Sequence, residues 1–338
     1  MNKIMLLGEA WGEHEERERT AFVGPTGHLL NEMLLEVGIH PSECYKTNVF
    51  NRRPPRNLIS AFCGDKASGI DGYPALQSGK YVRNEFEPEF VRLTKELNAV
   101  APNVIVAFGN TATWALLGKP NIGAMRGFTY HSTHLVVGLK VLPTYHPAAI
   151  LRLWEYRPTV LADLHKAKRE SKYPDIKRPK REVWIEPTLE DLETFYERYI
   201  VGCSLLSVDI ETAGSQVTCI GFAPGASVSL VIPFYDSRAK TRSYWPNEHS
   251  ESQAWHFVQR VLATDVPKLF QNGLYDITFL LRSMGIKVRN AKEDTMLLHH
   301  ALQPESLKGL GYLGSIYTNE HNWKIMRDRV TKTIKRDD

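Results

Sequence analysis

The segment Met5-Leu-Leu-Gly-Glu-Ala-Trp-Gly-Glu13 joins an apolar run to a turn that is bracketed by glycines and carries an acid. Residues 4–7 are typical of a buried strand, and Gly8 and Gly12 are residues that commonly end one. Glu9 is then expected at the carboxyl end of that strand, which is the edge where open α/β sheets bind ligands. The same pattern also fits an ordinary strand-to-loop turn with a solvated acid. The pattern in the rest of the first half of the chain is needed to distinguish these two interpretations of Glu9.

That first half alternates strand-like and helix-like patterns around a loop insertion at residues 64–82. Strands are predicted over residues 45–50, 103–109 and 139–143, and helices over residues 27–37, 87–100 and 110–117, the last with Asn110 or Thr111 as its cap. Alternation of this kind favours a mostly parallel sheet that is covered on both faces. The loops that carry Glu9, Asn48 and His146 would then converge on one edge of the sheet, where a site is expected.

Composition places the chain among globular proteins. Its 338 residues are enough for two domains, and its contents of 43% apolar and 24% charged residues are typical of soluble proteins. No run approaches the roughly 18 apolar residues of a membrane span, and no secretory pattern begins the sequence, so a cytoplasmic protein without a membrane partner is predicted. Four cysteines lie far apart without a CxxC pair, which indicates small buried side chains rather than a zinc ribbon or a disulfide framework.

A basic strip divides the chain. Residues 166–182 hold eight Lys or Arg residues against three acids, a local charge of +5 in a chain of formal charge +4. Pro174 and Pro179 interrupt the strip, as in a solvated linker. A strip of this charge can equally contact phosphates without reading their sequence, in a salt-sensitive way. We therefore expect one domain over residues 1–165, a basic linker over residues 166–182, and a second domain over residues 183–338.

The second half begins with a helix whose start, Thr188 and Asp191, resembles a capping box. Strands are predicted over residues 205–211, 218–222 and 227–233, and helices over residues 250–263 and 273–284. The first of these strands alternates, with Leu206, Val208 and Ile210 on one face and Ser207, Asp209 and Glu211 on the other.

Asp209 and Glu211 are expected about 7 Å apart along one strand face. Two carboxylates that point the same way from a mostly apolar strand are costly unless a cation lies between them, which favours a Mg²⁺ or Mn²⁺ site. Asp276 follows on a predicted helix and is a further candidate ligand. The alternative is that these residues are ordinary surface acids.

Five blocks of the first half occur in an order that resembles the uracil-DNA glycosylase superfamily, nearest its family-4 branch. They are Gly8-Glu-Ala-Trp-Gly-Glu13, Ala21-Phe-Val-Gly-Pro-Thr-Gly-His-Leu-Leu30, Thr47-Asn-Val-Phe-Asn-Arg-Arg-Pro-Pro55, Val104-Ile-Val-Ala-Phe-Gly109 and Thr144-Tyr-His-Pro-Ala-Ala-Ile-Leu-Arg152. The resemblance spans about residues 3–165 and implies a three-layer, parallel-sheet glycosylase domain.

The resemblance assigns catalytic roles to Glu9 and His146. Breaking an N-glycosidic bond develops positive charge on the sugar and negative charge on the base, so a site needs an acid near the sugar and donors near the base. Glu9 would orient or activate the water and stabilise the sugar cation, and His146 would donate to the uracil oxygen.

The same resemblance implies the substrate-binding residues. Asn48 would read the base edge with its amide, and Phe22 would stack on a flipped uracil beside Gly8. The segment from Pro147 to Arg152 would fill or grip the DNA next to the vacated position. Taken singly, these residues also fit a turn cap, a core aromatic or a structural loop.

Two residues depart from the family pattern. Family-4 enzymes usually carry an iron–sulfur cluster, but Arg52 stands where the family's Cys precedes Arg-Pro-Pro, and Cys63 is left without partners. We therefore expect no cluster. Trp11 replaces the usual proline beside the expected catalytic acid, which brings the efficiency of catalysis into question.

The second half resembles the DEDD 3′–5′ exonucleases, in the form found as the proofreading domain of family-A DNA polymerases. Asp209, Glu211 and Asp276 match the first three acids, which implies an α/β ribonuclease H-like domain with two metal ions. The third motif, Tyr-x-x-x-Asp, is not found, because neither Asp337 nor Asp338 has a tyrosine four residues before it. The domain is therefore expected to be incomplete at its C-terminus.

Together these resemblances predict a DNA repair and replication protein that excises uracil and carries a proofreading-type exonuclease. A glycosylase-like domain followed by an exonuclease domain of this type resembles the N-terminal part of certain large-phage family-A DNA polymerases. The expected partners are uracil-containing DNA, single-stranded or primer-template, and the remaining polymerase region or a polymerase subunit, in the host cytoplasm if the chain is phage-encoded. The alternatives are a weakly catalytic module that senses uracil or grips DNA, and a chain in which the nuclease alone is active.

Overall fold

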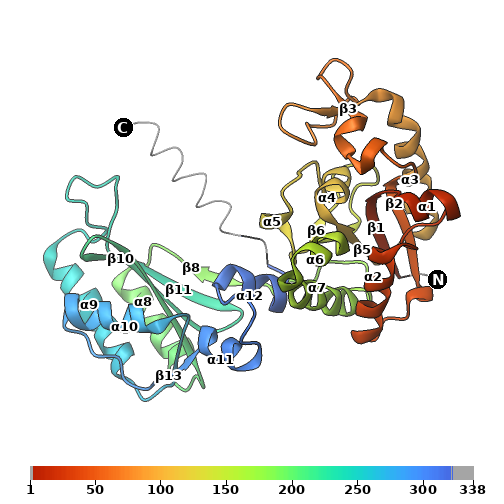
Figure 1. Cartoon of the computed structure of the whole chain (residues 1–338). Helices are drawn as coiled ribbons and strands as arrows, with labels where there is room; N and C mark the ends of the chain where they lie inside the picture. The colour runs from red at the N-terminus through yellow and green to blue at the C-terminus, as the bar shows by residue number, and fades with distance from the viewer. Residues whose placement is uncertain (1–2, 321, 323–338) are drawn as a thin grey trace. The chain divides into compact units, whose positions relative to one another are not determined.

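The computed structural model describes residues 3–320 and residue 322. Within these residues the chain forms two compact units, which Figure 1 shows in colours that follow the sequence. The first unit comprises the chain up to Arg178 and again from Gly311, and the second comprises Pro179–Leu310. No helix in the described part of the chain combines the length and the apolar character that crossing a membrane requires.

A five-stranded sheet forms the centre of the first unit. Its strands lie in the order β2 (Cys44–Phe50), β1 (Ile4–Ala10), β5 (Val104–Phe108), β7 (Lys140–Thr144) and β6 (Tyr130–His131). The first four are parallel, and β6 pairs with β7 in the antiparallel sense. Strand β1 runs through Gly8 and Glu9 to Ala10, further than expected, because β2 continues to provide hydrogen-bonding partners as far as Phe50.

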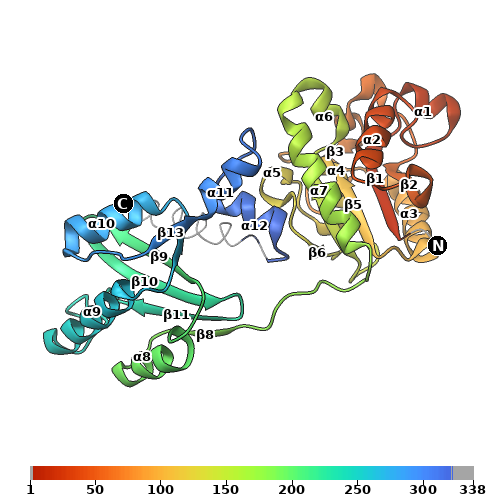
Figure 2. The same ribbon diagram turned by 90° about the horizontal axis from the view of Figure 1, so that it is seen from below.

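Helices cover both faces of this sheet, because alternate strand residues point to opposite sides. Leu6 and Val106 pack with α2 (Pro25–Glu36) and α7 (Arg157–Glu170) on one face. Met5 and Ile105 pack with α3 (Glu87–Val100) and α4 (Gly109–Leu117) on the other. Figure 2 shows α2 and α7 side by side over the sheet. The expected three-layer architecture is confirmed.

Short elements complete the first unit. They are the helices α1 (Glu13–Glu18), α5 (Ile122–Met125) and α6 (Pro147–Arg152), the two-residue strands β3 (Cys63–Gly64) and β4 (Tyr81–Val82), and short 3₁₀ turns at Pro41–Glu43, Pro55–Asn57, Ile59–Phe62, Asn84–Phe86 and Trp154–Tyr156. The strands β3 and β4 pair at the two ends of the expected loop insertion.

The second unit contains a six-stranded mixed sheet. Its order is β13 (Ala291–Asp294), β12 (Lys268–Phe270), β9 (Leu206–Ala213), β10 (Gln216–Gly225), β11 (Val228–Pro233) and β8 (Glu182–Trp184). The strands β9, β10 and β11 form an antiparallel meander, while β12 joins β9 and β13 joins β12 in parallel. This arrangement is the ribonuclease H-like fold that the sequence predicted.

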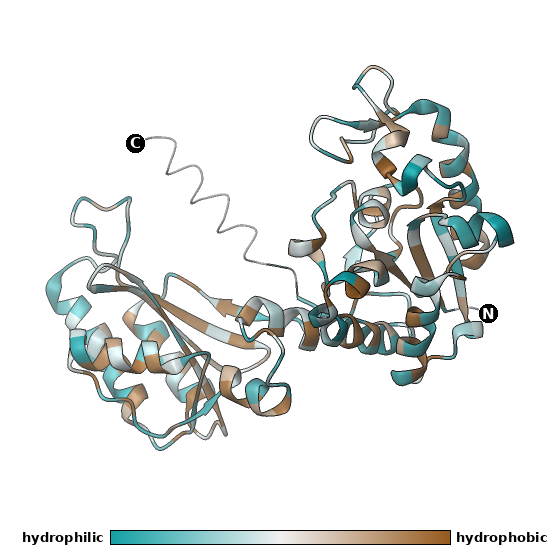
Figure 3. Cartoon of the chain, viewed as in Figure 1, coloured by the Kyte–Doolittle hydropathy of each residue, from teal (hydrophilic) through white to brown (hydrophobic). Residues whose placement is uncertain are grey.

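The helices of the second unit are α8 (Leu189–Phe195) with a π-helical turn at Tyr196–Ile200, α9 (Glu248–Ala263), α10 (Gly273–Met284) and α11 (Thr295–Leu302). The capping box at Thr188 and Asp191 is present as expected. In Figure 3 the apolar colour concentrates in the strands and on the helix faces that cover them. One core of buried residues, including Phe222 and Val258, holds these layers together.

The last described helix, α12 (Leu310–Tyr317), belongs from Gly311 to the first unit, although the sequence analysis placed it in the second domain. Lys166 in α7 fixes it: this ammonium is 1% exposed and donates to the carbonyl oxygens of Gly127 at 2.7 Å, Ser315 at 2.8 Å and Thr318 at 2.5 Å. Burial lowers the pKa of Lys166 to about 8, so the ammonium form prevails at pH 7.

The basic strip is therefore partly structural. It begins inside α7, which extends to Glu170, and Lys168 and Arg169 donate to the backbone carbonyls of Val37 and Ile316. Cations that bind buried carbonyl oxygens stabilise the first unit and are not available to phosphates.

Replacing Lys166 by Met should destabilise the first unit by about 3 kcal/mol, because three carbonyl oxygens lose their common donor while the apolar stem is kept. Urea denaturation would measure the free energy of unfolding. The control is Lys172→Met, an exposed lysine at the end of the same segment, which should change stability by about 0.5 kcal/mol or less. Equal losses in both variants would contradict this account of α12.

Candidate active sites

Glu9 lies in β1 near the carboxyl edge of the sheet and accepts a hydrogen bond from the hydroxyl of Thr111. Burial raises the pKa of Glu9, while the bond from Thr111 and the charge of Arg152 act in the opposite direction. Helix α4 begins at Gly109, with Phe108 as its N-cap, and not at the expected caps Asn110 or Thr111. The Thr111 hydroxyl is thus free to bind Glu9, a contact that the sequence analysis missed.

Asn48 and Phe22 meet at Gly8. In the parallel pairing of β1 with β2, Gly8 lies opposite Asn48. A Cβ atom at position 8 would lie 2.1 Å from Asn48 Oδ1 and 2.8 Å from Phe22 Cζ, both closer than side chains tolerate. Glycine is therefore required for the amide and the ring to approach the strand. Asn48 is 3% and Phe22 6% exposed, so both side chains are buried.

His146 completes this group at the start of α6. Its ring stacks near that of Phe22, with centroids 6.3 Å apart and planes at 25°. Nδ1 accepts the backbone N–H of Ala148 at 3.1 Å, and burial lowers the pKa of His146 to about 4. The ring is neutral at pH 7, so its single proton lies on Nε2, which is left as a donor.

A buried carboxylate that sequence reasoning missed holds the Phe22 loop. Glu15 in α1 accepts the backbone N–H groups of Gly12 at 3.1 Å, Val23 at 3.2 Å and Gly24 at 3.1 Å. Phe22 itself has a positive φ of 60°, which a non-glycine residue adopts only when its surroundings fix it. Glu15 is thus a positioning residue for the ring of Phe22. Its spacing from Gly12 is that of a capping box, the one signal that could have found it.

Pro147 and Arg152 lie at the two ends of α6. Pro147 is buried at the first helical position, where its missing N–H costs nothing, and Arg152 is exposed in the last turn. Arg152 is close enough to affect the pKa values of both Glu9 and His146. Apolar side chains beside it are exposed, with Leu151 at 53% and Trp154 at 62%. The helix therefore presents one charge and an apolar surface next to the catalytic candidates.

In the second unit, Asp209 and Glu211 are on the exposed face of β9, as their alternation predicted. Asp276 in α10 accepts the backbone N–H of Ile210 at 3.1 Å, which places it between them along the strand. Burial raises the pKa of Asp276 to about 6, and the charge of Asp209 adds to the effect. Burial and the charge of Glu211 likewise raise the pKa of Asp209.

The mutual repulsion of these carboxylates is what a divalent cation relieves, and their oxygen atoms fit Mg²⁺ or Mn²⁺. Within residues 3–320 and 322, however, no three acidic, His or Cys side chains converge closely enough to form a ligand shell. The residues thus fit the ion by chemistry and by location, but not by ligand distances. Asp337 and Asp338, considered for the missing motif, lie outside the described residues.

Three neighbours of these acids were given no role in the sequence analysis. Thr212 and Tyr275 share a hydrogen bond of 2.7 Å between their hydroxyls, which connects β9 to α10. Asp294 accepts the N–H groups of Asn272 at 3.2 Å and Gly273 at 2.8 Å, and so fixes the start of the helix that carries Asp276. Asp294 is therefore a positioning residue for Asp276.

The cysteines do not fit an iron–sulfur cluster, which needs four thiolates around one position. Cys44 is buried, and the Sγ atom of Cys63 donates to the carbonyl oxygen of Ile59 at 3.7 Å. Burial raises the pKa values of both thiols, which disfavours the thiolate form.

Comparisons with known proteins also divide the chain between residues 168 and 185, although the exonuclease match continues through α12. Residues 1–168 match the uracil DNA glycosylase superfamily, and residues 185–332 match a 3′–5′ exonuclease family. A type-4 uracil-DNA glycosylase of Thermotoga maritima is 34% identical over 170 residues, which cover 49% of this chain and 76% of that protein.

A DNA polymerase of Bacillus phage SP01 is 22% identical over 327 residues, covering 88% of this chain but only 32% of the polymerase. Among solved structures, RNase D of Trypanosoma brucei in complex with RNA U12 aligns with 41% of this chain and 47% of its own, at 18% identity and a TM-score of 0.31. The sequence matches decide the assignment: this chain belongs to the uracil-DNA glycosylase superfamily and carries, after its glycosylase domain, a domain of the 3′–5′ exonuclease family.

Proposed function

We propose that the first domain removes uracil from DNA by hydrolysing the N-glycosidic bond. The observation that carries this proposal is the meeting of a half-buried carboxylate, a neutral histidine, an amide and an aromatic ring at one edge of the sheet. The four side chains come from separate segments: Glu9, Asn48, Phe22 and His146. The absence of a side chain at Gly8 leaves room for the Asn48 amide and the Phe22 ring.

Asn48 and His146 would recognise and polarise the base. The amide of Asn48 offers one donor and one acceptor, which match the adjacent N3–H and O4 of uracil. The Nε2–H of His146 would donate to O2, where negative charge builds as the bond breaks. A neutral donor suits this task because it binds the developing anion more strongly than the ground-state carbonyl.

Glu9 would act on the sugar and the water. The bond between C1′ and N1 breaks, and its electron pair leaves with the base. The Glu9 carboxylate stabilises the positive charge on the sugar and takes a proton from the water whose oxygen bonds to C1′. The hydrogen bond from Thr111 favours the ionised carboxylate and orients it, against the effect of burial.

Helix α6 would grip the DNA beside the flipped nucleotide. Arg152 supplies a charge for a backbone phosphate, and the exposed Leu151 and Trp154 supply apolar surface for the position that the uracil leaves.

The second domain would hydrolyse phosphodiester bonds from a 3′ end. Asp209, Glu211 and Asp276 would hold Mg²⁺ or Mn²⁺, which when bound supplies charge for the attacking and leaving oxygens. The hydrogen bond from the N–H of Ile210 holds the Asp276 carboxylate in position. Asp294 fixes the start of the helix that carries Asp276. The 88% coverage by the phage polymerase supports a proofreading role within, or beside, a phage DNA polymerase in the host cytoplasm, with primer-template DNA and the polymerase region as partners.

Uracil excision should occur without metal and depend on Glu9. A single-stranded oligonucleotide with one uracil, incubated with the protein in EDTA and treated with alkali, should be cut at the uracil. Glu9→Gln should reduce the rate at least about a hundredfold, since the neutral amide neither takes the proton nor stabilises the cation. Gly8→Ala should have a similar effect by displacing Asn48 and Phe22.

Glu18→Gln, on the exposed surface of α1, is the matched control and should keep the full rate. No cleavage by the unmodified protein, with DNA binding retained, would replace this proposal with the second candidate, a uracil-sensing module whose catalysis is lost at Trp11.

The rate of excision should fall on the acid side of neutrality. The active form has ionised Glu9 and neutral His146; because the pKa of Glu9 is raised above 4.5, activity is lost as the pH falls through that raised value. His146, with its pKa near 4, gains its proton only at lower pH. Single-turnover rates at saturating DNA would give the profile, and Arg152→Gln should move the acid limb to higher pH because a charge that favours the carboxylate is removed. An unmoved limb would show that another group controls the rate.

Degradation from a 3′ end should require Mg²⁺ or Mn²⁺ and stop on addition of EDTA. Asp276→Asn should abolish it, since a ligand charge is removed while the side-chain shape is kept. Asp265→Asn, an exposed acid of the same unit that pairs with Arg289, should leave the rate unchanged. A 5′-labelled single strand without uracil, run on a denaturing gel, separates this activity from base excision. Equal rates in the two variants would contradict the assignment of Asp276.

A further inference from the structure

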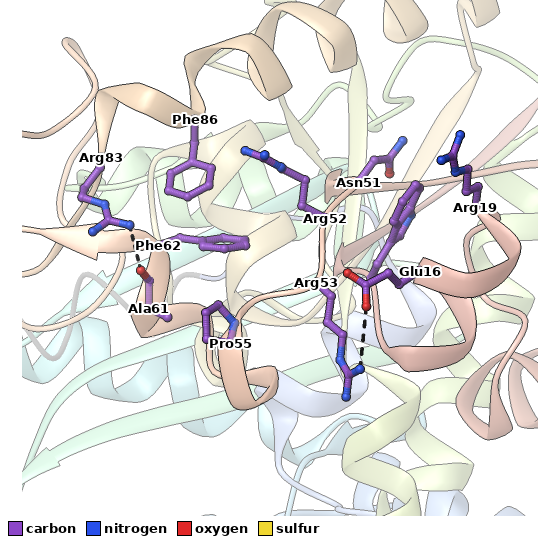
Figure 4. Close-up of a pocket in the computed structure, with 11 residues that line it drawn as sticks. Glu16, Arg19, Asn51, Arg52, Arg53, Pro55, Ala61, Phe62, Arg83 and Phe86 are labelled. Atoms are coloured by element: carbon purple, nitrogen blue, oxygen red, sulfur yellow. Dashed lines mark hydrogen bonds and ion pairs between the residues drawn. The ribbon is translucent and has the colours of Figure 1, made fainter.

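A pocket of about 600 Å³ opens in the first unit where the chain leaves β1 and β2. Its lining includes four arginines, Arg19, Arg52, Arg53 and Arg83, and one acid, Glu16 (Figure 4). The pocket is next to the glycosylase site, because the N–H of Trp11, two residues after Glu9, donates to the carbonyl oxygen of Arg52 at 3.2 Å. None of the lining residues is Cys or His, so the pocket is not suited to a cluster or a transition metal.

Two of the arginines have their charge neutralised locally. Guanidinium nitrogens of Arg53 lie 3.3 Å from a carboxylate oxygen of Glu13 and 3.7 Å from one of Glu16. A guanidinium nitrogen of Arg83 lies 2.7 Å from a carboxylate oxygen of Glu85. Neither Arg19 nor Arg52 has an ion-pair partner among residues 3–320 and 322. In Figure 4 the Arg52 side chain extends toward the part of the pocket where Arg83 and Phe86 lie. The lining therefore carries two uncompensated positive charges.

Polar atoms of the same lining lack hydrogen bonds. Trp11 Nε1, Arg83 Nε and Asn51 Oδ1 are buried and have no partner in the described part of the chain. Buried polar atoms without partners are rare, since each costs about 1–3 kcal/mol. Three belong to residues that line one pocket, so a ligand that shifts these side chains on binding would complete them. Two of the three are N–H donors, which matches the excess of positive charge and points to an anion.

We propose that this pocket binds the phosphate group of a nucleotide, either within a DNA strand or free. A phosphate accepts hydrogen bonds from several directions at once, which suits the separate positions of Arg52, Arg19 and the indole of Trp11. The pocket is larger than a phosphate alone and leaves room for the attached sugar. Asn51 Oδ1 would accept from a sugar hydroxyl or a base N–H. This function goes beyond base excision and does not require it.

The test uses the full chain, EDTA, and a fluorescein-labelled single strand that contains no uracil, so that neither loss of excision nor exonuclease action affects the result. Arg52→Gln should weaken binding about tenfold at low salt and reduce the slope of log affinity against log salt by about one. Trp11→Phe, which keeps an aromatic ring and removes the N–H, should weaken binding severalfold. Arg56→Gln, an exposed arginine of the same loop outside the pocket, is the matched control and should bind as the unmodified protein does.

Competition distinguishes the two sources of phosphate. The pocket takes free nucleotides if thymidine 5′-monophosphate displaces the strand while thymidine does not, and if the two compounds compete equally poorly with the strand in the Arg52→Gln variant. If neither competes while both variants weaken strand binding, the pocket takes a phosphate of the strand. Unchanged affinity and salt slope in both Arg52→Gln and Trp11→Phe would overturn the proposal, whatever the outcome for uracil excision.

Discussion

The first unit depends on the register in which β1 and β2 pair. This register places Gly8 opposite Asn48, and the missing side chain at Gly8 is the space into which the Asn48 amide and the Phe22 ring fit. A shift of the pairing by one residue would place Leu7 or Glu9 opposite Asn48 and so remove that space. The base site, the acid beside it and the packing of both helical layers therefore rest on one alignment of two strands.

Buried charge is used for structure as well as for chemistry. Glu15 collects three backbone N–H groups to hold the Phe22 loop, and Lys166 collects three carbonyl oxygens to hold α12. In both cases an ion replaces the water that these backbone groups would otherwise need. Asp209 and Asp276 differ, because burial raises their pKa values, the charge of a neighbouring acid adds to the effect, and a cation would offset both.

Local pattern predicted much of the fold. The helix expected over residues 87–100 has those bounds, and the alternation of β9 correctly placed Asp209 and Glu211 on the exposed face. The cap at Thr188 was also predicted correctly, because a capping box involves only neighbours in the chain. These features depend on periodicity and on contacts within a few residues, and both are readable from a sequence.

The sequence by itself determined the two α/β domains, their families and the edge at which Glu9, Asn48 and His146 gather. Only the tertiary structure decided that Thr111 binds Glu9, that Lys166 fixes a helix about 150 residues later in the chain, and that Arg52 lines a pocket with unpaired donors. The physical reason is that burial and hydrogen-bond partners depend on contacts between distant segments. A cation in a basic strip can be solvated, phosphate-bound or structural, and only its surroundings in the folded chain distinguish these states.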